Sequence, residues 1–508
     1  MPAGKHRRVL ILLAVLAVAA ICGTIAWAIR QVWPGSASKQ PHEGPVWEQA
    51  GSVAADAALD SRIRAVCGDC HAVPRPESFP RDAWQEEVEK GQKFYLDSGR
   101  TDLDPPPMAQ TVAYFRSRAP ETISYSEPHD ADTPLRVTFQ QERLDRAPDV
   151  KASTAVAGLC WTALGSKQPP VLVASDMFSG EVTSHDLGHP QSKSRLLAQL
   201  NNPCHIEPCD LDGDGALDLL VADLGSRNAR DHDLGRVIWL RQDGRTGRFE
   251  EIVLASGLGR VADVRPIALD SSGKLHLVVA EFGWSLTGGV LLLKNLASPG
   301  EQPRFEPEVL DPRAGTVHVP VFDLNRDGRP DFLALVSNES ECVEAFLNQG
   351  GGKFHRQTLW QAPDLTFGSS GIQLVDLDGD GDLDVLYANG DAFDNMRFSP
   401  WHGVQWLENR GAMQFAYHRI ADMFGAEVVQ AGDFDGDGDL DILLAAFVPP
   451  RLTPDWLAAR PLPSVVLLEQ SSPGQFARHT LERGFPCHAA VVVGDFNGDG
   501  RLDFAVGN

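Results

Sequence analysis

The chain is 508 residues long and strongly acidic, with a formal net charge of −24 from 45 basic and 69 acidic side chains. This surplus of acid argues against a nucleic-acid partner, because phosphate backbones are bound by clustered lysine and arginine. The length indicates about three folded units, at ~150 residues each. Hydrophobic residues make up 43% of the chain, as in a globular protein, and much of the surplus acid lies in short aspartate clusters.

Residues 1–30 have the pattern of an export signal. Three basic residues precede Val9–Ile29, which carries no charge and is long enough to cross a membrane as a helix. Because basic flanks stay in the cytoplasm, we expect an N-terminal transmembrane helix that anchors the protein facing the periplasm or the cell exterior. The alternatives are a signal peptide cleaved near Ala28 and a lipid-modified Cys22.

Residues 57–119 form a helical unit, after a linker at 31–56 that is rich in proline, glycine and serine. Apolar periodicity predicts helices at 54–66, 82–96 and 109–118. A second linker is expected at 120–134. The unit is therefore predicted to be a small all-α domain.

Cys67, Cys70 and His71 form a C-x-x-C-H sequence, the attachment motif of c-type haem. The two thiols form thioethers with the haem vinyl groups, and the histidine supplies an imidazole nitrogen to the iron. A bare C-x-x-C redox pair or zinc pair is the alternative, which the histidine and the export signal disfavour. The pattern predicts covalent haem c as a cofactor.

Met108 is the only methionine between residues 57 and 134, and it precedes the last predicted helix. This segment resembles the end of small soluble-type cytochrome c domains. The resemblance implies that Met108 is the sixth iron ligand, since methionine sulfur stabilises Fe(II). Two alternatives stay open: Met108 packs in the core and the iron is left open, or a second histidine such as His42 binds the iron.

From residue 135 onward, short apolar runs alternate with glycine- and aspartate-rich turns. One pattern recurs in frames that begin at residues 162, 210, 268, 323, 376, 433 and 495. Each repeat carries four strand signals, so we predict a seven-bladed β-propeller over residues 135–508, with four-stranded blades. Leu135–Leu144 is expected to pair with the last blade and close the ring; an open last blade is the alternative.

Five of the repeats contain the loop D-x-[DN]-x-D-G-x-x-D, in which alternate carboxylates converge on one hard cation. The predicted calcium ligands are Asp210, Asp212, Asp214 and Asp218; Asp323, Asn325, Asp327 and Asp331; Asp376, Asp378, Asp380 and Asp384; Asp433, Asp435, Asp437 and Asp441; and Asp495, Asn497, Asp499 and Asp503. These loops resemble FG-GAP/VCBS repeats of the integrin alpha-subunit type. The resemblance implies structural Ca2+ that staples the first hairpin of each blade. The frames at 162 and 268 lack the aspartates, and no calcium is expected there.

Long loops on the opposite face of the propeller are candidates for a ligand face. His205, His318 and His488 precede their frames by offsets of equal strand parity, so their side chains are expected on one side. The alternative is three hydrogen-bonded histidines at strand starts. Asp391, Asp394 and His402 are weaker candidates, since the aspartates also fit local turns and the histidine a strand start.

Five further cysteines, Cys160, Cys204, Cys209, Cys342 and Cys487, cannot all pair within one chain. Cys204–Cys209 is a possible bridge, and buried free thiols are the alternative. The function that best fits these features is haem electron transfer with an unidentified redox partner protein. A haem-coupled oxidoreductase with a substrate on the loop face, and an adhesion or scaffold module, are the alternatives. No motif commits the chain to an enzymatic reaction.

Overall fold

The structure is a computed structural model that describes residues 57–69, 72–126, 128–144, 154–165, 168–188, 194–298, 301–338, 340–393 and 395–508. The transmembrane helix predicted from the sequence has no counterpart in these ranges, because none of their helices is long and apolar enough to cross a bilayer. The segment for which it was predicted, Val9–Ile29, lies outside the described residues, as does the linker at 31–56.

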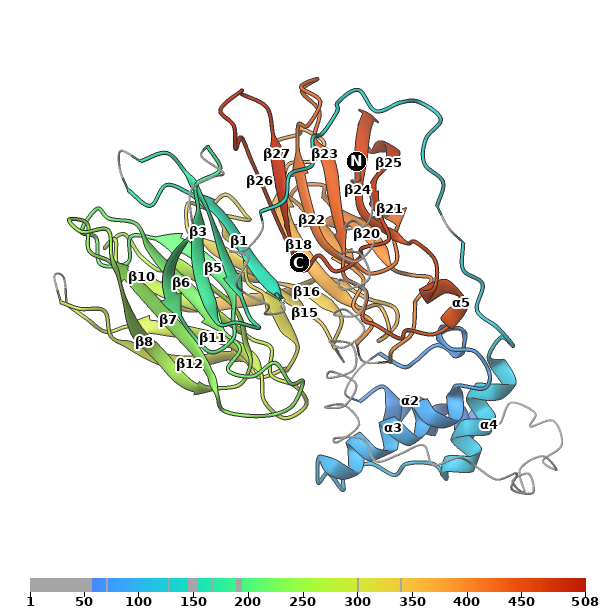
Figure 1. Ribbon diagram of the computed structural model, residues 1–508. Helices are drawn as coiled ribbons and strands as arrows, with labels where there is room; N and C mark the ends of the chain where they lie inside the picture. The colour runs from blue at the N-terminus through green and yellow to red at the C-terminus, as the bar shows by residue number, and fades with distance from the viewer. Residues whose placement is uncertain are drawn as a thin grey trace, which may run out of the picture. The chain divides into compact units, whose positions relative to one another are not determined.

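The helical unit contains α2 (Ala57–Cys67), the short 3-10 helix η2 (Pro76–Ser78), α3 (Trp84–Asp97) and α4 (Met108–Arg118) (Figure 1). Its core is aromatic: Trp84 stacks on Phe115 with ring centroids 4.1 Å apart, and Phe79 meets Trp84 edge-on at 5.3 Å. The three predicted helices are confirmed to within a few residues. Proline at 120 follows α4 closely, where it cannot continue a helix.

The rest of the chain forms antiparallel sheets, named sheet 1 to sheet 7 in chain order. Sheet 1 holds β1 (Val156–Thr162), β2 (Val171–Asp176), β3 (Glu181–His185) and β4 (Arg195–Gln199). Sheet 2 holds β5 (Pro203–Cys209), β6 (Asp218–Asp223), β7 (Gly235–Gln242) and β8 (Phe249–Leu258). Sheet 3 holds β9 (Val261–Ala268), β10 (Leu275–Glu281), β11 (Gly289–Asn295) and β12 (Phe305–Asp311).

Sheet 4 holds β13 (Thr316–His318), β14 (Val321–Phe322), β15 (Asp331–Val336), β16 (Cys342–Asn348) and β17 (Phe354–Gln361). Both β13 and β14 pair with β15, and Pro320 lies between them. Since proline has no N–H to donate, the first strand of this sheet is broken in two. Sheet 4 therefore has four strand positions although it has five strands.

Sheet 5 holds β18 (Ser369–Val375), β19 (Asp384–Asn389), β20 (Gly403–Asn409) and β21 (Phe415–Asp422). Sheet 6 holds β22 (Ala426–Gly432), β23 (Asp441–Ala446), β24 (Pro463–Ser472) and β25 (Gln475–Arg483), with the short helix α5 (Asp455–Ala458) between its second and third strands. Sheet 7 holds only β26 (Ala490–Gly494) and β27 (Asp503–Gly507).

The propeller thus has six complete blades, and the predicted seven four-stranded blades are wrong. The seventh repeat carries the loop and both flanking strands, but its sheet has two strands. The first strands still follow one another around a ring, because β1 lies beside β5 and also beside β26 and β27. A backbone hydrogen bond of 3.0 Å from Val156 N–H to the Asn508 carbonyl joins the two ends of the propeller.

The predicted strand at Leu135–Leu144 is also wrong, since no residue of this segment belongs to a strand. Its apolar side chains nevertheless alternate as a strand would: Leu135, Val137 and Phe139 pack against the core between sheets 6 and 7. The Phe139 ring lies 5.2 Å from the ring of Phe504 on β27. The segment, called the strap, therefore covers sheet 7 with side chains and without a ladder of backbone hydrogen bonds.

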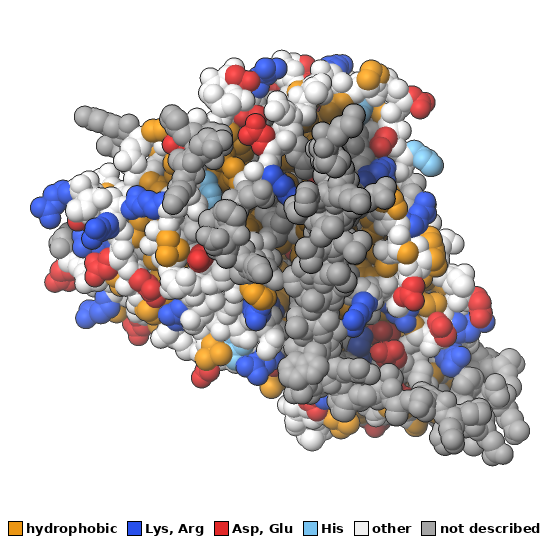
Figure 2. All heavy atoms as spheres, in the orientation of Figure 1, with side chains coloured by type: hydrophobic (Ala, Val, Ile, Leu, Met, Phe, Trp, Pro, Cys, Tyr) orange, Lys and Arg blue, Asp and Glu red, His pale blue; other side chains and the backbone are white. Residues whose placement is uncertain are grey.

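The second strands of sheets 2, 4, 5 and 6 are buried on both faces, which explains the continuous apolar runs after the aspartate loops of these sheets. In β6, Leu219 and Val221 face sheet 1, whereas Leu220 and Ala222 face sheet 3. Cys204 and Cys209 both carry free thiols, so the possible Cys204–Cys209 bridge does not form. On the face shown in Figure 2, acidic and basic side chains are intermixed.

Candidate functional site

The haem-attachment motif begins at the C-terminal end of α2, where Cys67 is the last helical residue and packs against the aromatic core. Burial raises the pKa of its thiol. Gly68 allows a close turn: a Cβ at this position would lie 2.6 Å from the Arg64 carbonyl oxygen and 2.9 Å from Val73 Cγ2. Cys70 and His71 lie outside the described residues.

The segment that leads to Met108 is fastened to this motif by ion pairs. The Arg100 guanidinium lies 2.6 Å from the carboxylates of both Asp69, inside the motif, and Asp102. Arg62 on α2 makes a further pair of 2.9 Å with Asp104. These contacts bring residues 100–104 alongside the end of α2.

Met108 is the first residue of α4 and is half-buried. Pro107 supplies the extended conformation from which the helix starts. The sequence places two thiols, an imidazole and a thioether in or beside this small helical unit, and this donor set would suit a covalently attached haem. When bound, such a haem would supply one-electron redox chemistry, and Cys67, Cys70, His71 and Met108 would hold it.

The aspartate loops join the first and second strands of their sheets. In three of them, carboxylate oxygens from three side chains lie within 4.8 Å of one another, and the groups are Asp210, Asp212 and Asp218; Asp376, Asp378 and Asp384; and Asp433, Asp435 and Asp437. The loops at 323 and 495 have an asparagine in the second position. Carboxylate and amide oxygens at this spacing fit a calcium ion.

The last aspartate of each loop has a role that the sequence did not reveal. Asp441 is fully buried; one of its oxygens accepts the Phe434 N–H at 3.1 Å, and the other accepts the Gln470 N–H at the end of β24 at 2.8 Å. Equivalent pairs of bonds are made by Asp218, Asp331 and Asp384. These carboxylates tie the loop to the third strand. Burial raises the pKa of Asp441 to about 6.

Two repeats differ from this scheme in an informative way. In sheet 3, which lacks the aspartate at this position, the His276 Nδ1 accepts the Asn295 N–H at 3.1 Å and takes over the same bond to the third strand. In sheet 7, Asp503 is half-buried and accepts the Phe496 N–H at 3.0 Å. The repeated sequence motif identified the last aspartate of each loop. Its hydrogen bond to the third strand could be seen only once the pairing register of that strand was known.

The structure brings two of the three candidate histidines together. His205 Nε2 lies 3.1 Å from one oxygen of Asp263, and His318 Nδ1 lies 3.6 Å from the other. Arg265 pairs with Asp263 at 2.9 Å and with Glu207 at 2.6 Å. The group lies on β5, β9 and β13, and Asp263 itself is fully buried. Burial raises the pKa of Asp263. The opposite effect of Arg265 and the two histidines is larger, so the pKa of Asp263 lies well below its usual range.

Asp263 and Arg265 were missed by the sequence analysis, because neither belongs to a repeated motif. The signal that could have found them is their place on β9, the first strand of sheet 3, because His205 and His318 also lie on the first strands of their sheets. Arg265 supplies the positive charge at the centre of this group, so an ion-paired network describes it better than a metal site. His488 lies elsewhere: it is buried, and its ring bonds Glu482 at 2.6 Å and Asn508.

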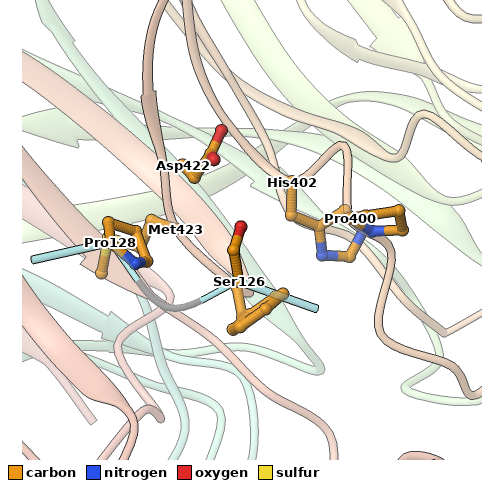
Figure 3. A pocket seen from close by; sticks show the side chains of 7 residues that line it. Ser126, Pro128, Pro400, His402, Asp422 and Met423 are labelled. Carbon is orange, nitrogen blue, oxygen red and sulfur yellow. The ribbon is translucent and has the colours of Figure 1, made fainter. Parts of the chain in front are cut away.

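His402 is buried and lines a cavity of about 10 Å³, a volume with room for about one water molecule. Figure 3 shows its ring beside Pro400, across from Ser126 and Pro128. Its Nδ1 faces the Gly425 N–H at 3.4 Å. Burial, with a smaller contribution from Arg419, lowers the pKa of His402 to about 3, so the ring is neutral at physiological pH.

Asp391 forms the local turn that was its alternative interpretation, since its carboxylate accepts the Phe393 N–H at 2.9 Å. Burial raises the pKa of Asp391, and it raises that of the neighbouring Glu427 to about 8 with a further contribution from Asp391. Asp394 lies outside the described residues. Asp391 and His402 lie close together, since the backbone of Asp391 acts on the pKa of the His402 ring, but Asp391 does not line the small cavity beside His402.

Comparison with known families identifies both parts of the chain. Residues 63–156 match the dihaem cytochrome c family, and residues 305–387 match the FG-GAP-like repeat. No curated protein matches the chain. The chain thus combines a dihaem cytochrome c domain with an FG-GAP-like repeat in a β-propeller arrangement. The sequence holds a single C-x-x-C-H motif, at 67–71, so one covalent haem is expected in the matched domain.

Proposed function

We propose that this protein is an exported c-type haem electron-transfer protein whose propeller is stapled by calcium and docks a partner. The observation that carries the proposal is the C-x-x-C-H motif at the end of α2, inside the dihaem cytochrome c match. The ion pair between Arg100 and Asp69, which holds the segment before Met108 next to that motif, supports methionine as the second axial ligand. With His71 and Met108 both holding the haem iron, the haem would supply one-electron transfer and the iron would have no free position for a substrate.

Spectroelectrochemistry of the protein exported by cells that mature c-type haem tests the proposal. We expect a reversible one-electron couple that needs no organic substrate. Haem reduction that depends on an added substrate would instead favour the oxidoreductase alternative. Absence of a reversible couple would contradict electron transfer altogether.

Calcium at the aspartate loops is the second part of the proposal. The convergent carboxylates of the loops at 210, 376 and 433 support it, since such groups repel one another without a cation. Because the same loops are tied to the third strands by their last aspartates, a bound cation would stiffen the inter-strand connection of each sheet. Calorimetric titration of chelator-treated protein with Ca2+ tests this, and the absence of a binding heat would contradict it.

The third part is the location. The basic residues before the uncharged segment Val9–Ile29 support export, with the haem domain and propeller outside the cytoplasm and residues 1–30 attached to the membrane. Covalent attachment of haem c also takes place outside the cytoplasm in cells that have such an export route. Fractionation of cells that express the full chain, or the chain without residues 1–30, tests membrane attachment. We expect the shortened chain to lose both membrane recovery and haem.

A further inference from the structure

A buried carboxylate on the propeller binds the helical unit. Asp364 lies in the connection between β17 and β18 and is only 2% exposed. Its Oδ2 accepts the backbone N–H of Arg75 at 2.9 Å and the hydroxyl of Ser78 at 2.6 Å. Its Oδ1 accepts the N–H and the hydroxyl of Thr366, at 2.8 and 2.5 Å. Four donors thus satisfy this carboxylate, and two of them belong to the helical unit.

The bound turn is directly connected to the haem-attachment sequence and to the core of its domain. Arg75 follows His71 by four residues in the chain and precedes η2. The Pro76 carbonyl in η2 accepts the indole N–H of Trp84 at 3.1 Å. Trp84 in turn stacks on Phe115 of α4. A bond made at Arg75 and Ser78 therefore restrains the whole helical unit and not a loose loop.

Two further contacts lie beside the first. The Tyr125 hydroxyl donates to the Phe398 carbonyl at 3.2 Å, and its ring packs against Phe424 and Trp456 at 6.0 and 6.2 Å. Burial raises the pKa of Tyr125. Arg397, next to Phe398, lies close enough to both Tyr125 and Glu87 on α3 to act on their charge. The segment between the helical unit and the strap is thereby held on the propeller.

We propose that the propeller holds the haem domain in one fixed orientation, with the Asp364 carboxylate as the clasp. An unpaired carboxylate at this depth would be costly, so the site is built for the two donors that the turn supplies. The haem is then presented to its redox partner from a single position, and the domain does not swing on residues 120–134. The clasp does not require that the haem carries electrons, so it can be tested apart from the proposed function.

Hydrogen exchange of the full haem-loaded chain, read by mass spectrometry, tests the clasp. In Asp364→Ala we expect exchange in the peptide covering residues 72–80 to be at least tenfold faster, equivalent to about 1.4 kcal/mol. Asp364→Asn keeps an acceptor oxygen and should lie between Asp364→Ala and the unmodified chain. Ser78→Ala removes one donor from the other side of the contact, leaves the propeller sequence intact, and should give a smaller increase in the same peptide.

Asp231 offers a matched control, because its carboxylate also accepts four hydrogen bonds, but from a neighbouring propeller loop. The donors are the N–H groups of Ser285, Leu286 and Thr287 and the Thr287 hydroxyl. Asp231→Ala should accelerate exchange at residues 284–288 and leave residues 72–80 unchanged. If Asp364→Ala and Ser78→Ala both leave residues 72–80 at the unmodified rate, the haem domain is not clasped and the inference fails.

Discussion

Replacement of His402 should make the folded protein less sensitive to mild acid. In the folded state, burial and Arg419 hold the pKa of His402 at about 3, against an ordinary value near 6.5. Above pH 6.5 the ring is neutral in both folded and unfolded chains, so it adds no pH dependence. As the pH falls below 6.5, the unfolded chain binds a proton that the folded chain cannot, and folding stability decreases.

The expected size follows from these two values. At pH 5 the unfolded ring is mostly protonated and the folded ring is not, which lowers the free energy of unfolding by about 2 kcal/mol relative to pH 7. His402→Asn and His402→Gln cannot titrate in this range and should lack that loss. The other titrating groups are the same in all three proteins, so their contributions cancel in the comparison.

The assay is urea unfolding of the unmodified chain and both variants at pH 7 and pH 5, with propeller fluorescence as the probe. The variants should lose about 2 kcal/mol less than the unmodified chain between the two pH values. A loss of equal size in all three proteins would refute the reasoning. It would mean that His402 takes up a proton in the folded state, as an accessible ligand-binding histidine would.

Three further predictions concern the propeller. Phe139→Ala should lower the free energy of unfolding by about 2 kcal/mol in urea titrations, because it removes a half-buried ring and its two aromatic contacts, with Phe434 and Phe504. Gln140→Ala, on the exposed side of the strap, should have no effect, and equal effects of the two substitutions would contradict the packing. In the presence of chelator, Asp441→Ala should lower the free energy of unfolding by about 2–4 kcal/mol, since two buried N–H groups lose their acceptor, whereas Asp503→Ala should lower it by less. The reverse order would argue against the hydrogen bond that ties the loop to the third strand. Removal of calcium should lower the free energy of unfolding by about 3 kcal/mol per occupied site, relative to protein in free Ca2+ at 100 times the Kd. Calorimetric melting with and without chelator measures this difference. Identical melting curves would contradict calcium binding.

Much of the fold follows from local sequence pattern. In the repeat at 433, four apolar runs predict strands, and β22 to β25 contain them in order: Val428–Ala431, Ile442–Ala446, Val465–Glu469 and Phe476–Leu481. Of these strands, β23 is buried along its whole length, so its sequence is almost continuously apolar, and glycine and aspartate mark the loop before it. The helical unit was predictable for a similar reason, since its helices carry apolar periodicity and the last of them ends before Pro120.

The number of complete blades did not follow from the repeat count. The sequence contains seven frames, but a frame specifies only the loop and the two strands beside it. Leu135, Val137 and Phe139 alternate with polar residues and bury one side, which is the pattern of a strand. Alternation fixes which side chains point inward; it does not ensure that the backbone pairs with a neighbour. The strap satisfies the first condition and not the second.

The candidate site was predicted best where one short motif contains all the ligands. The aspartate loops fall into this class because residues two apart in a tight loop must converge. The ion pair of Arg100 with Asp69 and the clasp at Asp364 could not be predicted, since they join residues far apart in the chain through tertiary packing. Strand parity placed His205 and His318 correctly on one side, but His488 belongs to a different environment at the end of the ring.

The central claim is that the helical unit carries a covalent haem with His71 and Met108 as axial ligands. The most direct test is the optical spectrum, oxidised and reduced, of the protein exported in cells that mature c-type haem, with Met108→Ala and Cys67→Ala measured alongside. The account predicts a low-spin c-type spectrum whose iron–sulfur charge-transfer band disappears in Met108→Ala, and impaired covalent attachment in Cys67→Ala. An exported protein without covalent haem, or a charge-transfer band that persists in Met108→Ala, would contradict this account.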